Sequence, residues 1–258
     1  MSLDQSIQKI NFLKPAPFEL YLPTGTSPFP LICITPMLGR FAFLDDLFFE
    51  RQFARFFSSN GLATVVIDRP IFEFDPERGL EQVQEHLDES LRRNRLVLDF
   101  LCERKEIDRN RIGTYGMSFG AVVNSLWAAE DRRLKAHVFA LGGGNLPEIF
   151  LTSRDPLMRS CLKAAIQRSG LKGEDLLAAL KKVFRQDPLE AARSISGENV
   201  CLHLALFDRV IRFRYGLALR EALGKPETVF IPLGHYSSIL AIPFLRPGTL
   251  RFFRRKLS

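Results

Sequence analysis

The chain has 258 residues, 46% of them hydrophobic and 25% charged, which is enough apolar material for a sizeable core and argues against intrinsic disorder. No run approaches the roughly 20 consecutive apolar residues of a membrane-spanning helix, and the N-terminus contains no apolar signal core, so we expect a cytoplasmic protein without a transmembrane segment. The net charge of +7 raises nucleic acid as a partner, but acidic residues accompany the basic ones through most of the chain. No nucleic-acid partner is therefore expected.

Short apolar runs rich in β-branched residues alternate with longer helical patterns along the chain. This alternation is typical of βα units around a mainly parallel sheet, so we expect a single α/β domain spanning residues 1–258. The expected strands are 18–22, 30–35, 63–68, 111–116, 135–141, 199–207 and 227–233, the first of them an antiparallel edge strand. The expected helices are 45–59, 79–105, 119–130, 212–223 and 238–255.

One connection is too long for a simple alternation of strands and helices. About 55 residues, from Gly144 to Glu198, separate two expected strands, where an ordinary loop takes about 2–6 residues. The connection contains two amphipathic segments, PLMRSCLKAAIQRSG and GEDLLAALKKVFRQ, which favour a small helical cap at about 145–198. The alternative is a standard crossover helix with a long decoration. In either case its position above the strand ends would let it shape a pocket.

The stretch GTYGMSFGA places Ser118 between two glycines, after an expected strand and before an expected helix. A sharp strand-to-helix turn would hold this serine in a strained backbone conformation, and side chains at Gly116 and Gly120 would clash with the neighbouring elements. Such a turn lifts the hydroxyl clear of the sheet and aims the N–H groups of a helix start at its target. The alternative is a serine that only caps the helix.

A serine nucleophile needs a base, and the base needs a third group to orient it. Of the four histidines, only His235 follows an expected strand directly and lies in a glycine-led loop. Asp208 stands where the apolar strand LHLALF ends, so Ser118, Asp208 and His235 should face one crevice at the carboxyl edge of the sheet. Asp187 is the main competitor, although its Asp-Pro step is typical of a helix-start cap. Asp208 itself could also be only a cap.

The segments PLICITPMLGR, GLATVVIDRP, EIDRNRIGTYGMSFGA, FDRV and PLGHY resemble the α/β-hydrolase fold superfamily in residue content and order, over the chain from about residue 28 to the end. DRNRIGTYGMSFG especially resembles the dienelactone-hydrolase and acyl-peptidase-like branches. The resemblance implies an α/β-hydrolase fold with Ser118 as nucleophile, His235 as general base and acid, and Asp208 as its orienting group. By analogy, the backbone N–H groups of Leu38 and Phe119 would form the oxyanion hole, with Met37 as the alternative to Leu38.

These residues together predict a serine hydrolase, most simply a carboxylic ester hydrolase that forms an acyl-enzyme on a small-molecule substrate and uses no metal or cofactor. Thioester or amide cleavage on the same triad stays open, as does a non-catalytic binding protein of this fold. Arginines near the expected site favour an anionic substrate as a further alternative: Arg40, Arg69, Arg209 and Arg212.

The C-terminal segment LRPGTLRFFRRKLS is basic without acidic neighbours. We expect a final helix that packs its Phe and Leu residues on the core with its arginines outward, and contact with a membrane surface or a polyanion is the alternative. The four cysteines, Cys33, Cys102, Cys161 and Cys201, are scattered and include no C-x-x-C pair. This spacing favours reduced, mostly buried thiols over a zinc site or a disulfide framework.

Overall fold

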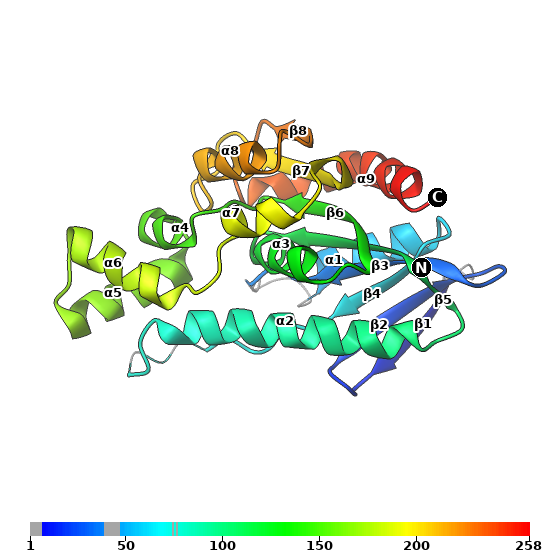
Figure 1. Ribbon diagram of the computed structural model, residues 1–258, viewed down its shortest axis with the longest axis horizontal. Coiled ribbons are helices and arrows are strands. Elements are labelled where there is room, and N and C mark those ends of the chain that lie inside the picture. Colours follow the sequence, from blue (N-terminus) through cyan, green and yellow to red (C-terminus); the bar gives the residue numbers. More distant parts are fainter. Residues whose placement is uncertain (1–6, 39–46, 74, 76) are drawn as a thin grey trace.

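The computed structural model describes residues 7–38, 47–73, 75 and 77–258. Within them the chain forms an eight-stranded sheet in the order β1-β2-β4-β3-β5-β6-β7-β8, in which β2 runs antiparallel to both neighbours and every other pair is parallel (Figure 1). The strands are β1 Ile7–Phe12, β2 Phe18–Pro23, β3 Phe29–Thr35, β4 Ala63–Ile67, β5 Ile107–Met117, β6 Leu134–Ala140, β7 Val200–Ala205 and β8 Glu227–Ile231. The mainly parallel sheet expected from the sequence is confirmed.

Helices cover both faces of this sheet. The helices of the described residues are α1 Phe48–Ser58, α2 Glu81–Cys102, α3 Phe119–Glu130, α4 Leu146–Thr152, α5 Pro156–Ser169, α6 Gly173–Val183, α7 Pro188–Ala191, α8 Phe213–Ala222 and α9 Ile242–Lys256. In β3, Leu31 and Cys33 pack in the core that α2 and α3 cover, whereas Ile32 and Ile34 pack in the core that α1 and α9 cover. A strand buried on both faces has to be apolar at every position, which explains the unbroken run LICI.

One expectation about the sheet edge is wrong. The strand FELYL was expected at the edge, but β2 is second from the edge and β1 lies outside it. Three residues of β1, Gln8, Lys9 and Asn11, are exposed and the other three are only partly buried, so no apolar run marks this strand. Lys9 reaches across to Glu19 of β2 at 2.9 Å, and a lysine on an outer strand also opposes pairing with another chain.

The order of the strands reverses between β3 and β5. From β3 the chain continues to β4 on one side of the sheet and then crosses to β5 on the other side. In open α/β sheets, ligands bind outside the carboxyl ends of the strands at such a switch point. The segment Pro36–Leu38 follows β3 there, and Ser118 follows β5.

The long connection between β6 and β7 is helical. It contains α4, α5, α6 and α7, and in Figure 1 α5 and α6 project beyond the N-terminal end of α2. These helices bury a small apolar cluster of their own, which includes Phe150, Cys161, Leu176 and Leu180 together with Leu80 just before α2. The connection is therefore built of packed helices.

The C-terminal segment folds as a helix on the core. Phe252 and Phe253 of α9 are buried, and Arg251 and Arg254 are exposed, as expected. Arg246 is the exception, because its guanidinium lies half-buried over the ring of Phe53 at 5.5 Å. Among the described residues, no helix is both long and apolar enough to cross a membrane.

The expectation of mostly buried thiols is confirmed. Cys33, Cys161 and Cys201 are buried and unpaired, and Cys102 is partly buried. Burial raises the pKa of Cys161 and of Cys201 to about 12, so both are thiols rather than thiolates at neutral pH.

Candidate active site

Ser118 occupies a strained turn between β5 and α3. Its φ of 56° and ψ of −118° lie in a region that side chains other than glycine rarely adopt. A Cβ on Gly116 would lie 2.2 Å from the Gly120 carbonyl oxygen, and a Cβ on Gly120 would lie 2.1 Å from the Thr35 carbonyl oxygen. Both distances are far inside van der Waals contact, so the two glycines that flank Ser118 have the steric cause expected from their spacing.

The structure brings Ser118, His235 and Asp208 together. The Ser118 Oγ lies 2.9 Å from the His235 Nε2, and the His235 Nδ1 lies 2.6 Å from the Asp208 Oδ2. Asp208 follows β7, and His235 follows β8, so three strand ends supply the three side chains. Side chains of His235 and Asp208 are 8% and 3% exposed, which shields their hydrogen bond from water.

The Asp208 carboxylate is fixed from its other side. Its Oδ1 accepts the backbone N–H of Val210 at 2.8 Å and that of Ile211 at 2.9 Å. Two backbone donors hold the carboxyl plane, so Oδ2 points at the imidazole. The turn DRVI thus holds the carboxylate of Asp208 in place.

Two backbone segments flank the Ser118 hydroxyl. Phe119 is the first residue of α3, where an N–H has no carbonyl partner one turn earlier in the helix. On the other segment, the Met37 N–H donates to the Glu50 Oε1 at 3.2 Å, and the Met37 carbonyl accepts from the Arg69 Nη1 at 2.9 Å. Of the two alternatives, Met37 and Leu38, the first is already engaged by a side chain.

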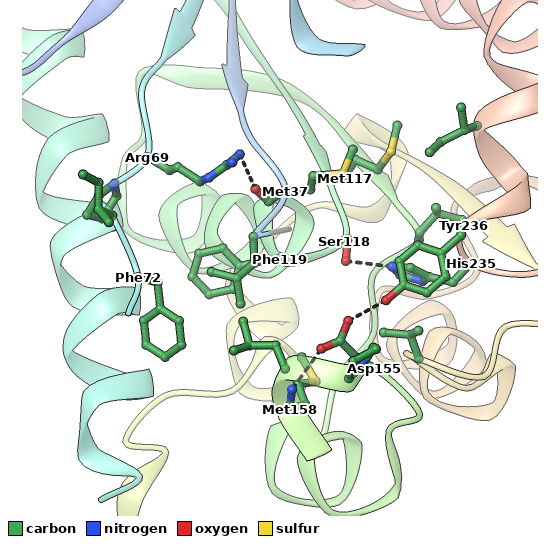
Figure 2. A pocket seen from close by; sticks show the side chains of 18 of the residues that line it. Met37, Arg69, Phe72, Met117, Ser118, Phe119, Asp155, Met158, His235 and Tyr236 are labelled. Atoms are coloured by element: carbon green, nitrogen blue, oxygen red, sulfur yellow. Dashed lines mark hydrogen bonds between the residues drawn. The ribbon is translucent and has the colours of Figure 1, made fainter. Parts of the chain in front are cut away.

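A cavity of about 770 Å³ opens above Ser118 and His235. Figure 2 shows its walls, which are largely apolar and carry few charged groups. The apolar part includes Met37, Ile71, Phe72, Met117, Phe119, Leu157, Met158 and Ile239, and the charged part is Asp68, Arg69, Glu73 and Asp155. Because Asp155, Leu157 and Met158 lie at the start of α5, the helical connection forms one wall of this cavity.

Comparison with protein families supports the resemblance seen in the sequence. The family model described as esterase FrsA-like matches residues 4–158, which is more than half of the chain. The chain belongs to the FrsA-like esterase family. No curated protein sequence matches this FrsA-like chain.

Solved structures with the same fold include several hydrolases. An acetyl xylan esterase from Paenibacillus sp. R4 superimposes with a TM-score of 0.68 at 18% identity, covering 100% of this chain and 90% of that one. An acylaminoacyl peptidase from Pyrococcus horikoshii gives 0.69 at 19%, covering 98% and 42%. A cold-adapted esterase from an Arctic intertidal metagenomic library gives 0.64 at 17%, covering 100% and 97%. These similarities establish the α/β-hydrolase fold of the FrsA-like chain.

The competing residues of the FrsA-like chain have structural roles. Asp187 accepts the backbone N–H groups of Asn145, Leu146 and Leu189, so it caps α7 and holds the start of α4. His137 and His203 are buried inside β6 and β7, and burial lowers the pKa of each to about 4. They are neutral at physiological pH and face the core.

His86 is a further buried histidine, on α2. Its ring lies 4.9 Å from that of Phe72 and 5.2 Å from that of Phe119, both of which line the cavity. Burial, with help from Arg69 and Arg93, lowers the pKa of His86 to about 4. This histidine therefore packs as a neutral ring behind the cavity wall.

One contact at the site was not anticipated from the sequence. Tyr236, next to His235, donates its hydroxyl to the Asp155 Oδ2 at 2.5 Å, and the Asp155 Oδ1 accepts the Met158 N–H at the start of α5 (Figure 2). Burial and the hydrogen bond to Asp155 raise the pKa of Tyr236 well above its usual range, so the phenol stays protonated. Of the four arginines considered for an anionic substrate, Arg69 lines the cavity, and Arg40 lies outside the described residues.

Proposed function

We propose that this chain is a serine hydrolase that cleaves carboxylic esters, with Ser118 as nucleophile, His235 as general base and acid, and Asp208 as its orienting group. The observation that carries the proposal is the continuous hydrogen-bonded path from the Ser118 Oγ through His235 to Asp208 at the base of the cavity. The FrsA-like esterase family and the hydrolases that share the fold support the same chemistry.

The reaction follows from these positions in two halves. The Ser118 Oγ attacks the ester carbonyl carbon while its proton passes to the His235 Nε2, and the Asp208 carboxylate stabilises the resulting imidazolium. N–H groups of Phe119 and Leu38 bind the oxyanion. The intermediate then expels the alcohol, which takes the proton from His235. Water, activated by His235, attacks the acyl-serine and releases the acid, which restores the Ser118 hydroxyl.

The cavity walls favour an apolar substituent on the ester. Phe72, Leu157 and Met158 present carbon and sulfur atoms to the space beyond Ser118, and burial of a chain against them gains about 0.8 kcal/mol per CH₂ group. Two of these residues belong to the helical connection. We therefore assign residues 145–198 as a cap on a single domain, residues 1–258, with the cap and the sheet sharing the binding of the substrate.

Covalent labelling tests the nucleophile. Reaction of the parent chain with a fluorophosphonate should phosphonylate one serine, and Ser118→Ala should abolish the adduct. Ser125→Ala is the matched control, because Ser125 lies on α3, the helix that follows Ser118, is buried and donates its hydroxyl to the Val122 carbonyl. The tryptic peptide 112–132 carries both serines, so mass spectrometry of one peptide locates the adduct in all three proteins.

Substrate series then define the reaction class. p-Nitrophenyl esters of increasing acyl length should show kcat/KM rising with each CH₂ group until the cavity is full, and matched thioesters and anilides compare the competing bond types. Labelling of Ser118→Ala to the parent level would disprove the assignment of the nucleophile. Folded parent protein that neither labels nor hydrolyses any member of the series would instead support a binding protein of this fold.

A further inference from the structure

The segment after β3 carries one N–H that can serve the oxyanion, and its direction depends on a neighbouring peptide group. In a trans peptide, the C=O of one residue and the N–H of the next point in opposite directions. The carbonyl of Met37 therefore sets the direction of the Leu38 N–H. That carbonyl is held by the Arg69 Nη1 at 2.9 Å. In Figure 2, Arg69 reaches the Met37 carbonyl from the side away from Ser118.

We infer that Arg69 is a positioning residue that fixes the Leu38 N–H in the oxyanion hole by binding the Met37 carbonyl. The inference rests on the proposed function. A charged donor on the carbonyl also polarises the peptide, which makes its N–H a stronger donor to a developing negative charge.

A second contact keeps the segment from turning the other way. The Met37 N–H donates to the Glu50 Oε1, and Glu50 is buried on α1. Rotation of the Met37–Leu38 peptide would break the contact with Arg69, and a shift of the preceding peptide would break the contact with Glu50. The N–H and the carbonyl of Met37 are thus both held by side chains. Of the N–H groups of Met37 and Leu38, only that of Leu38 is left to face the substrate.

The position of Arg69 is itself fixed by the sheet. β3 and β4 are parallel neighbours with Ile34 opposite Val66, so Met37 and Arg69 are each the second residue after the end of their strand. Pro70 is buried and restricts Arg69 to extended backbone conformations. The arginine therefore reaches Met37 from a constrained backbone.

The test compares Arg69→Met with Arg69→Lys and with Arg109→Met, an exposed arginine near the start of β5, at the end of that strand away from Ser118. On a neutral p-nitrophenyl ester, Arg69→Met should lower kcat by about 10-fold to 10²-fold, less than the roughly 10²–10³-fold cost of losing an oxyanion donor outright, with KM changed less than about threefold. Arg69→Lys should recover part of this loss, and Arg109→Met should match the parent.

A transition-state analogue separates positioning from a merely structural role. A trifluoromethyl ketone forms a hemiketal oxyanion on the nucleophile, so its affinity should fall in Arg69→Met by the same factor as kcat/KM. An unchanged kcat on the neutral ester in a folded Arg69→Met protein would overturn the inference. So would a rise of KM confined to an anionic ester such as p-nitrophenyl hydrogen succinate, because Arg69 would then bind substrate.

Failure of the inference and failure of the proposed function give different results. If the parent is labelled at Ser118 and Arg69→Met turns over the neutral ester as fast as the parent does, only the role of Arg69 is wrong. If the folded parent neither labels nor turns over esters, the proposed function is wrong and the role of Arg69 is wrong with it. Should Arg69→Met not fold, Arg69→Lys decides alone. A partial drop in kcat and in inhibitor affinity without a rise in KM supports positioning. Parent-like values of both, or a rise in KM alone, overturn it.

Discussion

Replacement of Thr35 by valine should destabilise the fold more than the loss of one hydroxyl suggests. Thr35 ends β3 and is 4% exposed; its hydroxyl donates to the Asn124 Oδ1 at 2.6 Å and accepts from the Asn94 Nδ2 at 2.8 Å. Valine keeps the shape and leaves both buried amides without this partner. Each orphaned buried polar group costs about 1–3 kcal/mol, so the free energy of unfolding should fall by about 2–6 kcal/mol.

Local rearrangement of the Asn94 and Asn124 amides does not replace the hydrogen bonds lost in Thr35→Val. The Asn124 Nδ2 already has no hydrogen-bond partner within the described part of the chain. Rotating the Asn124 amide in Thr35→Val therefore does not give it a new partner in place of the lost hydroxyl. Asn94 and Asn124 are 1% and 0% exposed, which keeps bulk water from serving either amide. The cost should therefore appear in full.

Urea unfolding of Thr35→Val beside Thr64→Val measures the effect. Thr64 is fully buried on the neighbouring strand β4, and its hydroxyl makes a single hydrogen bond, to the Leu62 carbonyl at 3.1 Å. Thr64→Val should cost about 1 kcal/mol. Equal destabilisation of the two variants would refute the reasoning, because it would mean that the two amides gain nothing from Thr35.

Three further changes test the triad, the core of the sheet and the helical connection. Asp208→Asn should lower kcat roughly 10⁴-fold in steady-state assays, since an amide N–H facing the Nδ1 of His235 selects the tautomer that cannot accept the serine proton. Burial lowers the pKa of His203 to about 4, below its unfolded value near 6.5, so protons favour the unfolded chain and stability falls as pH drops from about 6.5 to 4. Between pH 7 and pH 5 this residue should account for about 2 kcal/mol of the fall in the free energy of unfolding. Urea unfolding should show that this part of the pH dependence is missing in His203→Gln. Tyr236→Phe removes the hydrogen bond to Asp155 and should speed amide hydrogen exchange in α5 while exchange in α2 stays unchanged.

The parallel strands and the ends that supply the site could be predicted from sequence because their signals are local. Ser118 and Asp208 stand within a few residues of β5 and β7, whose carboxyl halves are buried on both faces. His235 follows the apolar run VFIPL, which marks β8 although this last strand of the sheet is mostly exposed. Parallel strands place their carboxyl ends at one edge, so residues distant in sequence were expected to meet there. The hydrogen bonds from Ser118 to His235 and from His235 to Asp208 agree with that expectation.

The contacts that the sequence does not reveal depend on side chains crossing between elements. Tyr236 and Asp155 are 81 positions apart, and nothing in either local pattern couples them. The contact between Arg69 and the Met37 carbonyl depends on the path of the backbone after β3, which proline and methionine leave open. Strand β1 was missed for a related reason: an outer strand with one solvated face needs no apolar run, and only its pairing with β2 reveals it.

The strained serine explains why buried polar groups gather around this turn. A positive φ at Ser118 costs about 1–3 kcal/mol and persists only where neighbouring contacts leave no relaxed alternative. The Gly120 backbone lies against the Thr35 carbonyl with no room for a methyl group, and the Thr35 hydroxyl is tied to α2 and α3 through Asn94 and Asn124. Thr35 is followed, two residues later, by Met37, whose carbonyl Arg69 holds. The hydrogen bonds that stabilise the strained turn therefore also set the path of the proposed oxyanion segment, so loosening Thr35 should weaken the fold and slow ester cleavage together.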